Sequence, residues 1–120
     1  MNDYQKSLVR KMDTYVHFVY KITKNFPKHE LYGVVSQIRR ATVSVVLNYI
    51  EGYARKRLLV RLNFLEISFG SLKESKYLLH FSLVEEYITK DDYHTGLRMT
   101  EEISAMLWTE VDNLEKYCKR

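Results

Sequence analysis

The side chains that could perform metal chemistry are few and widely spaced. The histidines are His17, His29, His80 and His94, and none has a glutamate three residues before it. A Glu-x-x-His pair on one helix supplies carboxylate and imidazole ligands to the di-metal centres of four-helix bundles. Asp91 stands three residues before His94, but a single pair of this kind does not make a dinuclear site. The sequence therefore indicates no metal centre.

Motifs for nucleophilic catalysis or phosphate cradling are absent as well. The one cysteine, Cys118, has no partner at metal-ligand spacing and stands near the end of the sequence. Gly70 and Ser71 lie inside a helical pattern, not between a strand and a helix, so they do not form a phosphate-binding loop. We assign no catalytic residue and no cofactor, and we expect a protein that is not an enzyme.

A stripe of small and polar residues has regular helical spacing. The steps are four, three, four and four residues, and the members are Gln37, Ala41, Ser44, Asn48 and Gly52. Such spacing places them on one face of a helix. Small side chains allow helices to approach closely, and polar ones need hydrogen-bond partners once they are buried.

The partners of this stripe are expected on a second helix, where Glu74 follows Ser71 by three residues. Ser44 and Asn48 are predicted to hydrogen-bond with Ser71 and Glu74, while Gly70 allows close contact. The full predicted structural network is Ser44, Asn48, Glu51, Ser71 and Glu74. We favour this structural role over a ligand site.

The elements that must position these residues are four amphipathic helices. Apolar residues at steps of three and four predict them over residues 3–25, 27–54, 58–85 and 90–117. Pro27 separates the first two helices, because proline lacks an N–H and restricts the residue before it. Thr89 is expected to cap the fourth helix, with Asp92 in its first turn. Since short connections make neighbouring helices antiparallel, the expected fold class is all-α, an antiparallel up-down-up-down four-helix bundle with residues 1–120 as a single domain.

Composition agrees with one helical domain and excludes other classes. The chain has 120 residues, of which 46% are hydrophobic, with only 4 glycines and 1 proline. That apolar content argues against disorder, and the scarcity of turn residues argues against an all-β fold. No signal peptide or membrane-spanning run is present, and a single cysteine suits a reducing compartment, so a cytoplasmic protein without membrane contact is expected.

Charge is distributed unevenly along the chain. Residues 1–61 contain 12 Lys/Arg and 4 Asp/Glu, for a net charge of +8, whereas residues 62–120 contain 7 and 11, for −4. A basic half favours anionic partners such as nucleic acid. The candidate contacts are Arg39, Arg40, Arg55, Lys56, Arg57 and Arg61, with Lys21, Lys24 and Lys28 as a second patch. The alternatives are a solvated basic surface and, for Arg39 or Arg40, an ion pair inside the chain or between subunits.

Two motifs together carry a family resemblance. They are Gln-Ile-Arg-Arg-Ala, Ser and Asn-x-x-Glu-Gly over residues 37–52, and Phe-Leu-x-Ile-x-x-Gly-Ser-Leu-x-Glu over residues 64–74. Over about residues 8–117 the chain resembles the bacterial four-helix bundles encoded in intervening sequences of large-subunit ribosomal RNA genes. The same family includes the accessory variability determinants of diversity-generating retroelements. Tyr49, Ile50 and Ser68 depart from the family pattern, which often has Ile, Ala and Ala at these positions.

The resemblance implies a barrel-shaped homopentamer, and for the accessory proteins it implies binding of nucleic acid and of a partner reverse transcriptase through basic surfaces. We therefore expect a non-enzymatic oligomeric bundle that binds RNA or DNA, or a nucleic-acid-handling protein, with little sequence specificity. The alternative is a structural or protein-interaction bundle without nucleic-acid binding. The 10 tyrosines support that alternative, since tyrosine is enriched at protein interfaces.

Overall fold

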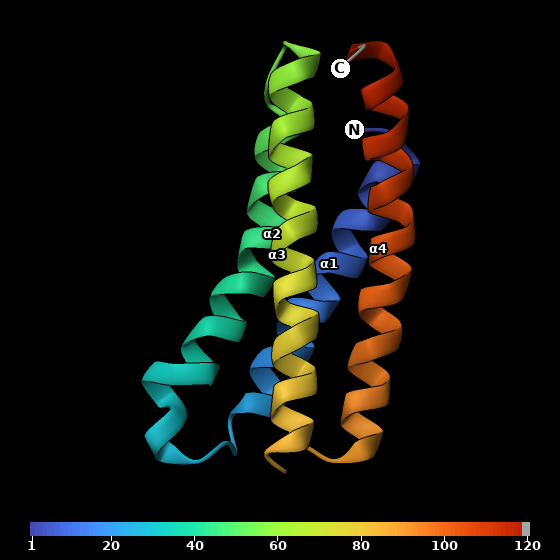
Figure 1. The fold of residues 1–120 in the computed structure, drawn as a ribbon. Coiled ribbons are helices and arrows are strands. Elements are labelled where there is room, and N and C mark those ends of the chain that lie inside the picture. Colours follow the sequence, from blue (N-terminus) through green and yellow to red (C-terminus); the bar gives the residue numbers. More distant parts are fainter. Residues whose placement is uncertain (119–120) are drawn as a thin grey trace.

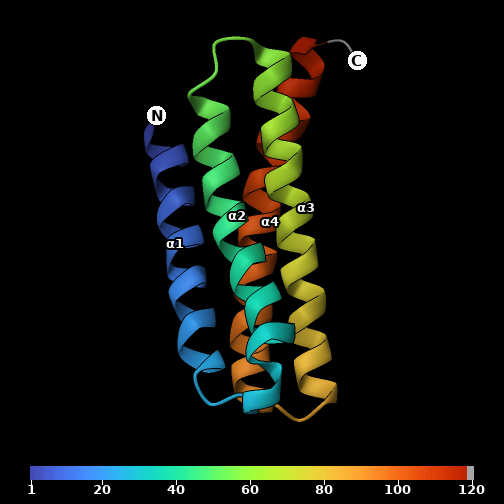
Figure 2. The same cartoon turned by 90° about the vertical axis from the view of Figure 1, so that its left-hand side faces the viewer.

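Four long helices run alternately up and down in the computed structural model, which describes residues 1–118 (Figures 1 and 2). They are α1 (Asp3–Thr23), α2 (Ser36–Tyr53), α3 (Leu58–Val84) and α4 (Lys90–Cys118). Each helix packs on its neighbours in sequence, and α1 closes the bundle against α4. The expected all-α, antiparallel four-helix bundle is confirmed, and residues 1–118 contain no strand.

The core follows the apolar periodicity of the helices. On α1 the buried positions include Leu8, Met12, Tyr15 and Val19, which are three or four residues apart and therefore share one face. Comparable stripes of α2, α3 and α4 meet this face along the long axis of a body measuring 45 × 24 × 22 Å. Within the described residues, no helix is both long and apolar enough to cross a membrane.

The start of the second helix differs from the sequence prediction. An uninterrupted helix from Pro27 is wrong, because a 3-10 turn (Lys28–Glu30) and a wider π-type turn (Leu31–Val35) precede α2. The backbone of Gly33 is not helical there, with φ −104° and ψ −115°. The carboxylate of Glu30 accepts hydrogen bonds from the Val34 amide at 3.4 Å and the Tyr87 hydroxyl at 2.9 Å. These side-chain bonds stabilise an irregular turn that leans away from α3, in cyan in Figure 1.

Side chains cap the free backbone amides at the starts of some helices but not of others. Asn2 and Gln5 form a reciprocal capping box at the start of α1. Thr89 caps α4 as predicted, since its hydroxyl accepts from the Asp92 amide at 3.1 Å. In contrast, α3 begins without a side-chain cap and without an acidic residue in its first turn.

Candidate functional site

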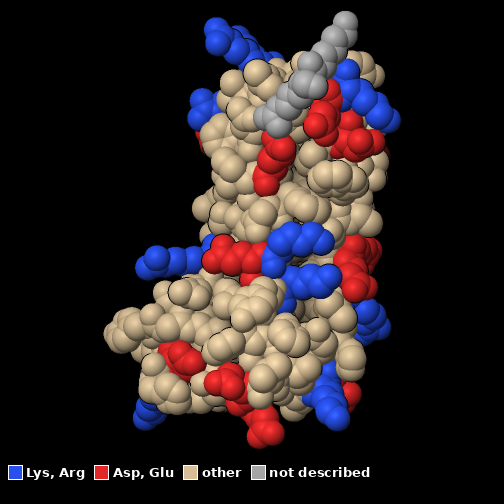
Figure 3. Space-filling view, in the orientation of Figure 1, with Lys and Arg blue, Asp and Glu red and all other residues tan. Residues whose placement is uncertain are grey.

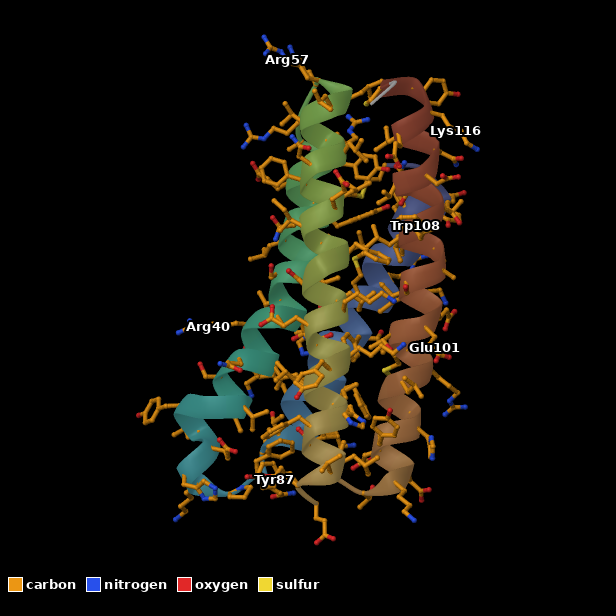
Figure 4. The ribbon with its side chains drawn as sticks, viewed as in Figure 1. Arg40, Arg57, Tyr87, Glu101, Trp108 and Lys116 are labelled. Atoms are coloured by element: carbon orange, nitrogen blue, oxygen red, sulfur yellow. The ribbon has the colours of Figure 1, made fainter. Side chains whose placement is uncertain are left out.

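The connection between α2 and α3 brings four cations together at one end of the bundle. We call Arg55, Lys56, Arg57 and Arg61 the basic junction. Arg55, Lys56 and Arg57 are exposed, and Figure 4 shows Arg57 projecting from this end into solvent. Among the described residues, no hydrogen bond or ion pair engages the side chains of Lys56 and Arg57. These two cations are therefore open to an anionic partner.

The other two members of the junction are held by the protein. Arg61 donates to the carbonyl of Gly52 at 3.2 Å and to that of Arg55 at 2.9 Å. Its guanidinium also lies 4.8 Å from the ring centroid of Tyr53. Arg55 pairs with Glu51 one turn earlier and lies 5.3 Å from the ring of Phe64. Arg61 thus closes the loop on the end of α2, and Arg55 is partly neutralised.

The uncapped start of α3 adds to the positive potential of the junction. Free amides at a helix N-terminus carry partial positive charge and attract anions. The starts of α1 and α4 bear Asp3 and the pair Asp91 and Asp92, respectively, whereas α3 starts with Leu58 and Leu59 directly after Arg57. Neither a side-chain cap nor a first-turn acid competes with an external anion at this helix end.

The remaining predicted cations do not join this junction. Arg40 is exposed and points outward midway along the molecule in Figure 4, about 20 Å along α2 from its last residue, Tyr53, at 1.5 Å per residue. Arg39 turns instead to α1, where it donates to the Thr23 hydroxyl at 2.9 Å and lies 4.6 Å from the ring of Tyr20. Arg39 therefore binds within its own chain, to a hydroxyl and an aromatic ring rather than to a carboxylate in an ion pair.

The side of the molecule shown in Figure 3 carries charges of both signs. Lys21, Lys24 and Lys28 are exposed where α1 ends, at the opposite end of the bundle from the basic junction. On the side shown in Figure 3, lysines and arginines alternate with carboxylates in mixed clusters. The net charge of −4 on the second half of the sequence therefore does not make this side uniformly acidic.

The polar stripe of α2 meets α3 through one direct side-chain bond. The hydroxyls of Ser44 and Ser71 are 2.8 Å apart. Asn48 donates to the carbonyl and the hydroxyl of Ser44, both at 2.8 Å, so the prediction that it bonds across to α3 is wrong. Its amide lies over its own helix because Ser44 is one turn away. Glu74 is exposed and lines a groove beside Ser71, and Glu51 pairs with Arg55 outside this contact.

The close approach of the two helices occurs at a different glycine from the one predicted. A Cβ added to Gly70 would meet nothing within 4 Å, because this residue faces outward from α3. A Cβ on Gly52 would lie 2.6 Å from Leu65 Cδ1 and 3.2 Å from the carbonyl oxygen of Arg61. The buried Ser68 supplies a second bond between the helices, donating to the Val45 carbonyl at 2.7 Å.

A buried carboxylate on α4 is the polar centre that the sequence interpretation missed. Glu110 accepts hydrogen bonds from the hydroxyls of Tyr49 and Tyr53 and, at 3.3 Å, from the side-chain amide of Gln5. Burial raises the pKa of Tyr49 and Tyr53 above its ordinary value, and the bonds to Glu110 act in the same direction. Both hydroxyls therefore stay protonated as donors.

One sequence signal could have identified Glu110. It follows Ile103 by seven residues and Leu107 by three, so it occupies the apolar phase of α4. A glutamate at such a position needs buried donors. Its partner Tyr49 is 61 residues away, and helical periodicity does not reveal that pairing.

The described part of the chain can be compared with the ligand sets of metal centres. Within residues 1–118, no group of three or more His, Cys, Asp or Glu side chains is placed to hold a metal ion. The chemistry available at the basic junction is electrostatic attraction and hydrogen bonding to anions.

Comparison with known proteins identifies the family. The family described as 23S rRNA-intervening sequence protein matches residues 5–109, which is most of the chain. The chain belongs to this family. The intervening-sequence fold is also seen in a crystal structure from Bacteroides thetaiotaomicron, a protein of unknown function from the S23 ribosomal protein family. That structure has a TM-score of 0.78 and 22% identity, and the match covers 87% of this chain and 97% of the other.

These matches establish the family and the fold. Neither description names an enzymatic activity. No curated protein matches the chain.

Three positions at which this chain departs from the family pattern, Tyr49, Ile50 and Ser68, have visible structural roles. Tyr49 is fully buried and bonds to Glu110, so its ring fills the chain's own core. Ile50, the next residue, is 44% exposed on the outer side of α2. The hydroxyl of Ser68 adds the bond to Val45 described above.

Proposed function

We propose that this protein binds nucleic acid, or a nucleic-acid-handling protein, through the basic junction. The observation that carries the proposal is the uncapped N-terminus of α3 directly behind two exposed, unpaired cations, Lys56 and Arg57. Oriented amides and cations that face the same solvent attract phosphate oxygens. Contacts of this kind are to the backbone and give little sequence specificity.

In this proposal the protein acts as an assembly of identical chains in the cytoplasm. An apolar face supports self-association, and we define it as Leu47 and Ile50 of α2 with Ile67 of α3, which are 60%, 44% and 51% exposed. The antiparallel register that pairs Ser44 with Ser71 puts Leu47 and Ile67 at the same level of the bundle, each about one turn from that contact. By family resemblance the assembly is a pentamer, which would repeat the basic junction five times and multiply phosphate contacts.

The second candidate function is a protein-interaction bundle without nucleic-acid binding. The same apolar face favours it, since exposed contiguous apolar surface marks interaction sites. The two candidates differ in whether charge reversal at the basic junction has any effect on binding.

Binding to mixed RNA and DNA oligonucleotides at about 50 and 200 mM salt separates the two candidates. Two phosphate contacts per chain predict a loss of affinity of about tenfold over this range, from a slope of about −0.9 for each contact. A Lys56→Glu/Arg57→Glu variant should lose most of the low-salt affinity. A Lys21→Glu/Lys24→Glu variant has the same change in charge at the opposite end and should retain it.

Absence of binding at low salt would contradict the proposal and favour the interaction bundle. Equal losses in the two variants would show that net charge, rather than the basic junction, attracts the nucleic acid.

A further inference from the structure

A cavity of about 380 Å³ lies at the same end of the bundle as the basic junction. It is formed where α1 and α3 begin and α2 and α4 end, so all four helices contribute to its walls (Figure 1). Its size falls in the range of roughly 300–1,000 Å³ that is typical of small-molecule sites. The residues that define its chemistry are Tyr4, Tyr53, Arg61, Glu110, Asn113 and Tyr117.

Tyr4 and Tyr117 give the cavity its accessible aromatic surface, whereas the ring of Tyr53 is already occupied by the Arg61 guanidinium at 4.8 Å and the Tyr49 ring at 5.1 Å. The ring of Tyr4 is held by a bond of 2.9 Å from its hydroxyl to the Met106 carbonyl, and the residue is 40% exposed. The hydroxyl of Tyr53 is bound to Glu110, while Tyr117, on the last turns of α4, is 76% exposed. Exposed tyrosines such as Tyr4 and Tyr117 can stack with unpaired nucleobases, and the interaction tolerates any base.

The polar groups of the cavity are arranged by charge. On the α3 side stands the guanidinium of Arg61, which is held by the carbonyls of Gly52 and Arg55 and contributes its positive charge from that fixed position. On the α4 side stand the exposed amide of Asn113 and the carboxylate of Glu110, whose partners within residues 1–118 are neutral donors rather than a lysine or arginine. A nucleotide has the matching polarity, with an anionic phosphate at one side and a base edge of neutral donors and acceptors at the other.

We propose that this cavity receives an unstacked base of a single-stranded nucleic acid whose phosphates lie on the basic junction. The inference rests on the proposed function and specifies its ligand, because a base inside a duplex cannot leave its stack without an energetic cost. Single strands are therefore preferred over duplexes, and the preference comes from the tyrosine walls rather than from the cations.

The test compares three fluorescent oligonucleotide probes of about 12 nucleotides per strand at about 50 mM salt. They are a thymidine single strand, the same strand with abasic sites in place of its central bases, and a blunt duplex. Fluorescence anisotropy of the wild-type protein should show about tenfold tighter binding to the thymidine strand than to the abasic strand, the size expected for stacking of one base. The duplex should bind about as weakly as the abasic strand.

A Tyr4→Ala/Tyr117→Ala variant should lose this preference while keeping its affinity for the abasic strand. Tyr117→Ala alone, at a largely exposed position, should reduce the preference without disturbing the fold, which circular dichroism checks. Tyr32→Ala is the matched control, since Tyr32 is 92% exposed and lies in the turn before α2 at the other end of the bundle.

The outcomes distinguish the inference from the proposed function. Equal wild-type affinity for the thymidine and abasic strands would overturn the base site while leaving phosphate binding at the basic junction intact. An undiminished preference in both folded tyrosine variants, or an equal loss in the Tyr32→Ala control, would overturn it as well. If no probe binds at low salt, both proposals are wrong.

Discussion

Glu110 is the one charged side chain that is buried among residues 1–118. It is 9% exposed and satisfied by three neutral donors from α1 and α2. A buried polar group that loses a partner costs about 1–3 kcal/mol, whereas a satisfied one contributes little net stability. The hydroxyls around Glu110 are therefore more sensitive to substitution than exposed tyrosine hydroxyls.

Tyr49→Phe should lower the free energy of unfolding by about 1–3 kcal/mol, because it removes a donor from Glu110 and leaves the ring packing unchanged. Urea denaturation measures the change. Tyr32→Phe, at a 92% exposed position, is the control and should alter stability by less than about 0.5 kcal/mol. Equal effects of the two substitutions would mean that Tyr49 does not stabilise the buried carboxylate.

Stability should also fall in alkali above pH about 10. Burial raises the pKa of Tyr15, Tyr49 and Tyr53 in the folded chain, whereas in the unfolded chain tyrosine titrates near its ordinary value of 10.0. Below that pH both states hold these protons. Above it the unfolded chain releases protons that the folded chain retains, so the free energy of unfolding decreases, by at most about 1.4 kcal/mol per group and pH unit.

Guanidinium denaturation between pH 9 and 11 tests this linkage, with lysine titration cancelled by comparing variants. Tyr49→Phe removes one of the three groups, so its stability should decline less steeply than that of the wild type above pH about 10. Parallel declines would contradict the raised pKa of Tyr49.

At the level of the helices, the close packing of α2 against α3 requires a small residue where the two approach most closely. Gly52 lies against Leu65 and the backbone of Arg61. The side chain of the same Arg61 donates the hydrogen bonds to Gly52 and Arg55 that close the loop of the basic junction. Gly70 has open space around it, so its lack of a side chain serves no packing within one chain. Packing at Gly52 and the position of the basic junction are thus connected.

Gly52→Ala and Gly70→Ala should therefore change stability in opposite directions. The first should destabilise by about 1–3 kcal/mol through overpacking against Leu65 and the Arg61 carbonyl. The second should stabilise by up to about 1 kcal/mol, since alanine is the better helix former at an open position. Thermal unfolding followed by circular dichroism compares them, and destabilisation by both would show that Gly70 is also a packing site.

For the whole molecule, the apolar face and the basic junction lie on different parts of the surface. Leu47 is on the outer side of α2, whereas Arg57 projects from the end of the bundle. Copies can therefore associate side by side through α2 and α3 while their basic ends stay open to solvent. This arrangement lets assembly increase the avidity of a weak phosphate site.

Leu47→Lys should shift the proposed assembly toward single chains, because it places a charge in the centre of an apolar contact. Light scattering at micromolar concentration measures the mass. Val84→Lys introduces the same charge at a position that is 62% exposed at the end of α3, and it should leave the mass unchanged. A wild-type protein that is monomeric under these conditions would exclude the pentamer.

The sequence by itself determined the four helices, the Thr89 cap and the contact of Ser44 with Ser71. These features depend on spacing of three and four residues, on local capping chemistry and on two neighbouring helices in antiparallel register. The irregular turn before α2 escaped prediction because Tyr87, 57 residues from Glu30, helps to stabilise it.

Only the tertiary structure decided where the cations and the buried polar groups lie. Periodicity does not specify how far each helix is rotated or shifted against its neighbours, and that geometry sets Arg39 on Tyr20 and Tyr49 on Glu110. The same geometry made Gly52, rather than Gly70, the point of close approach. Local spacing identifies the faces of helices, but packing of the whole core determines which faces meet.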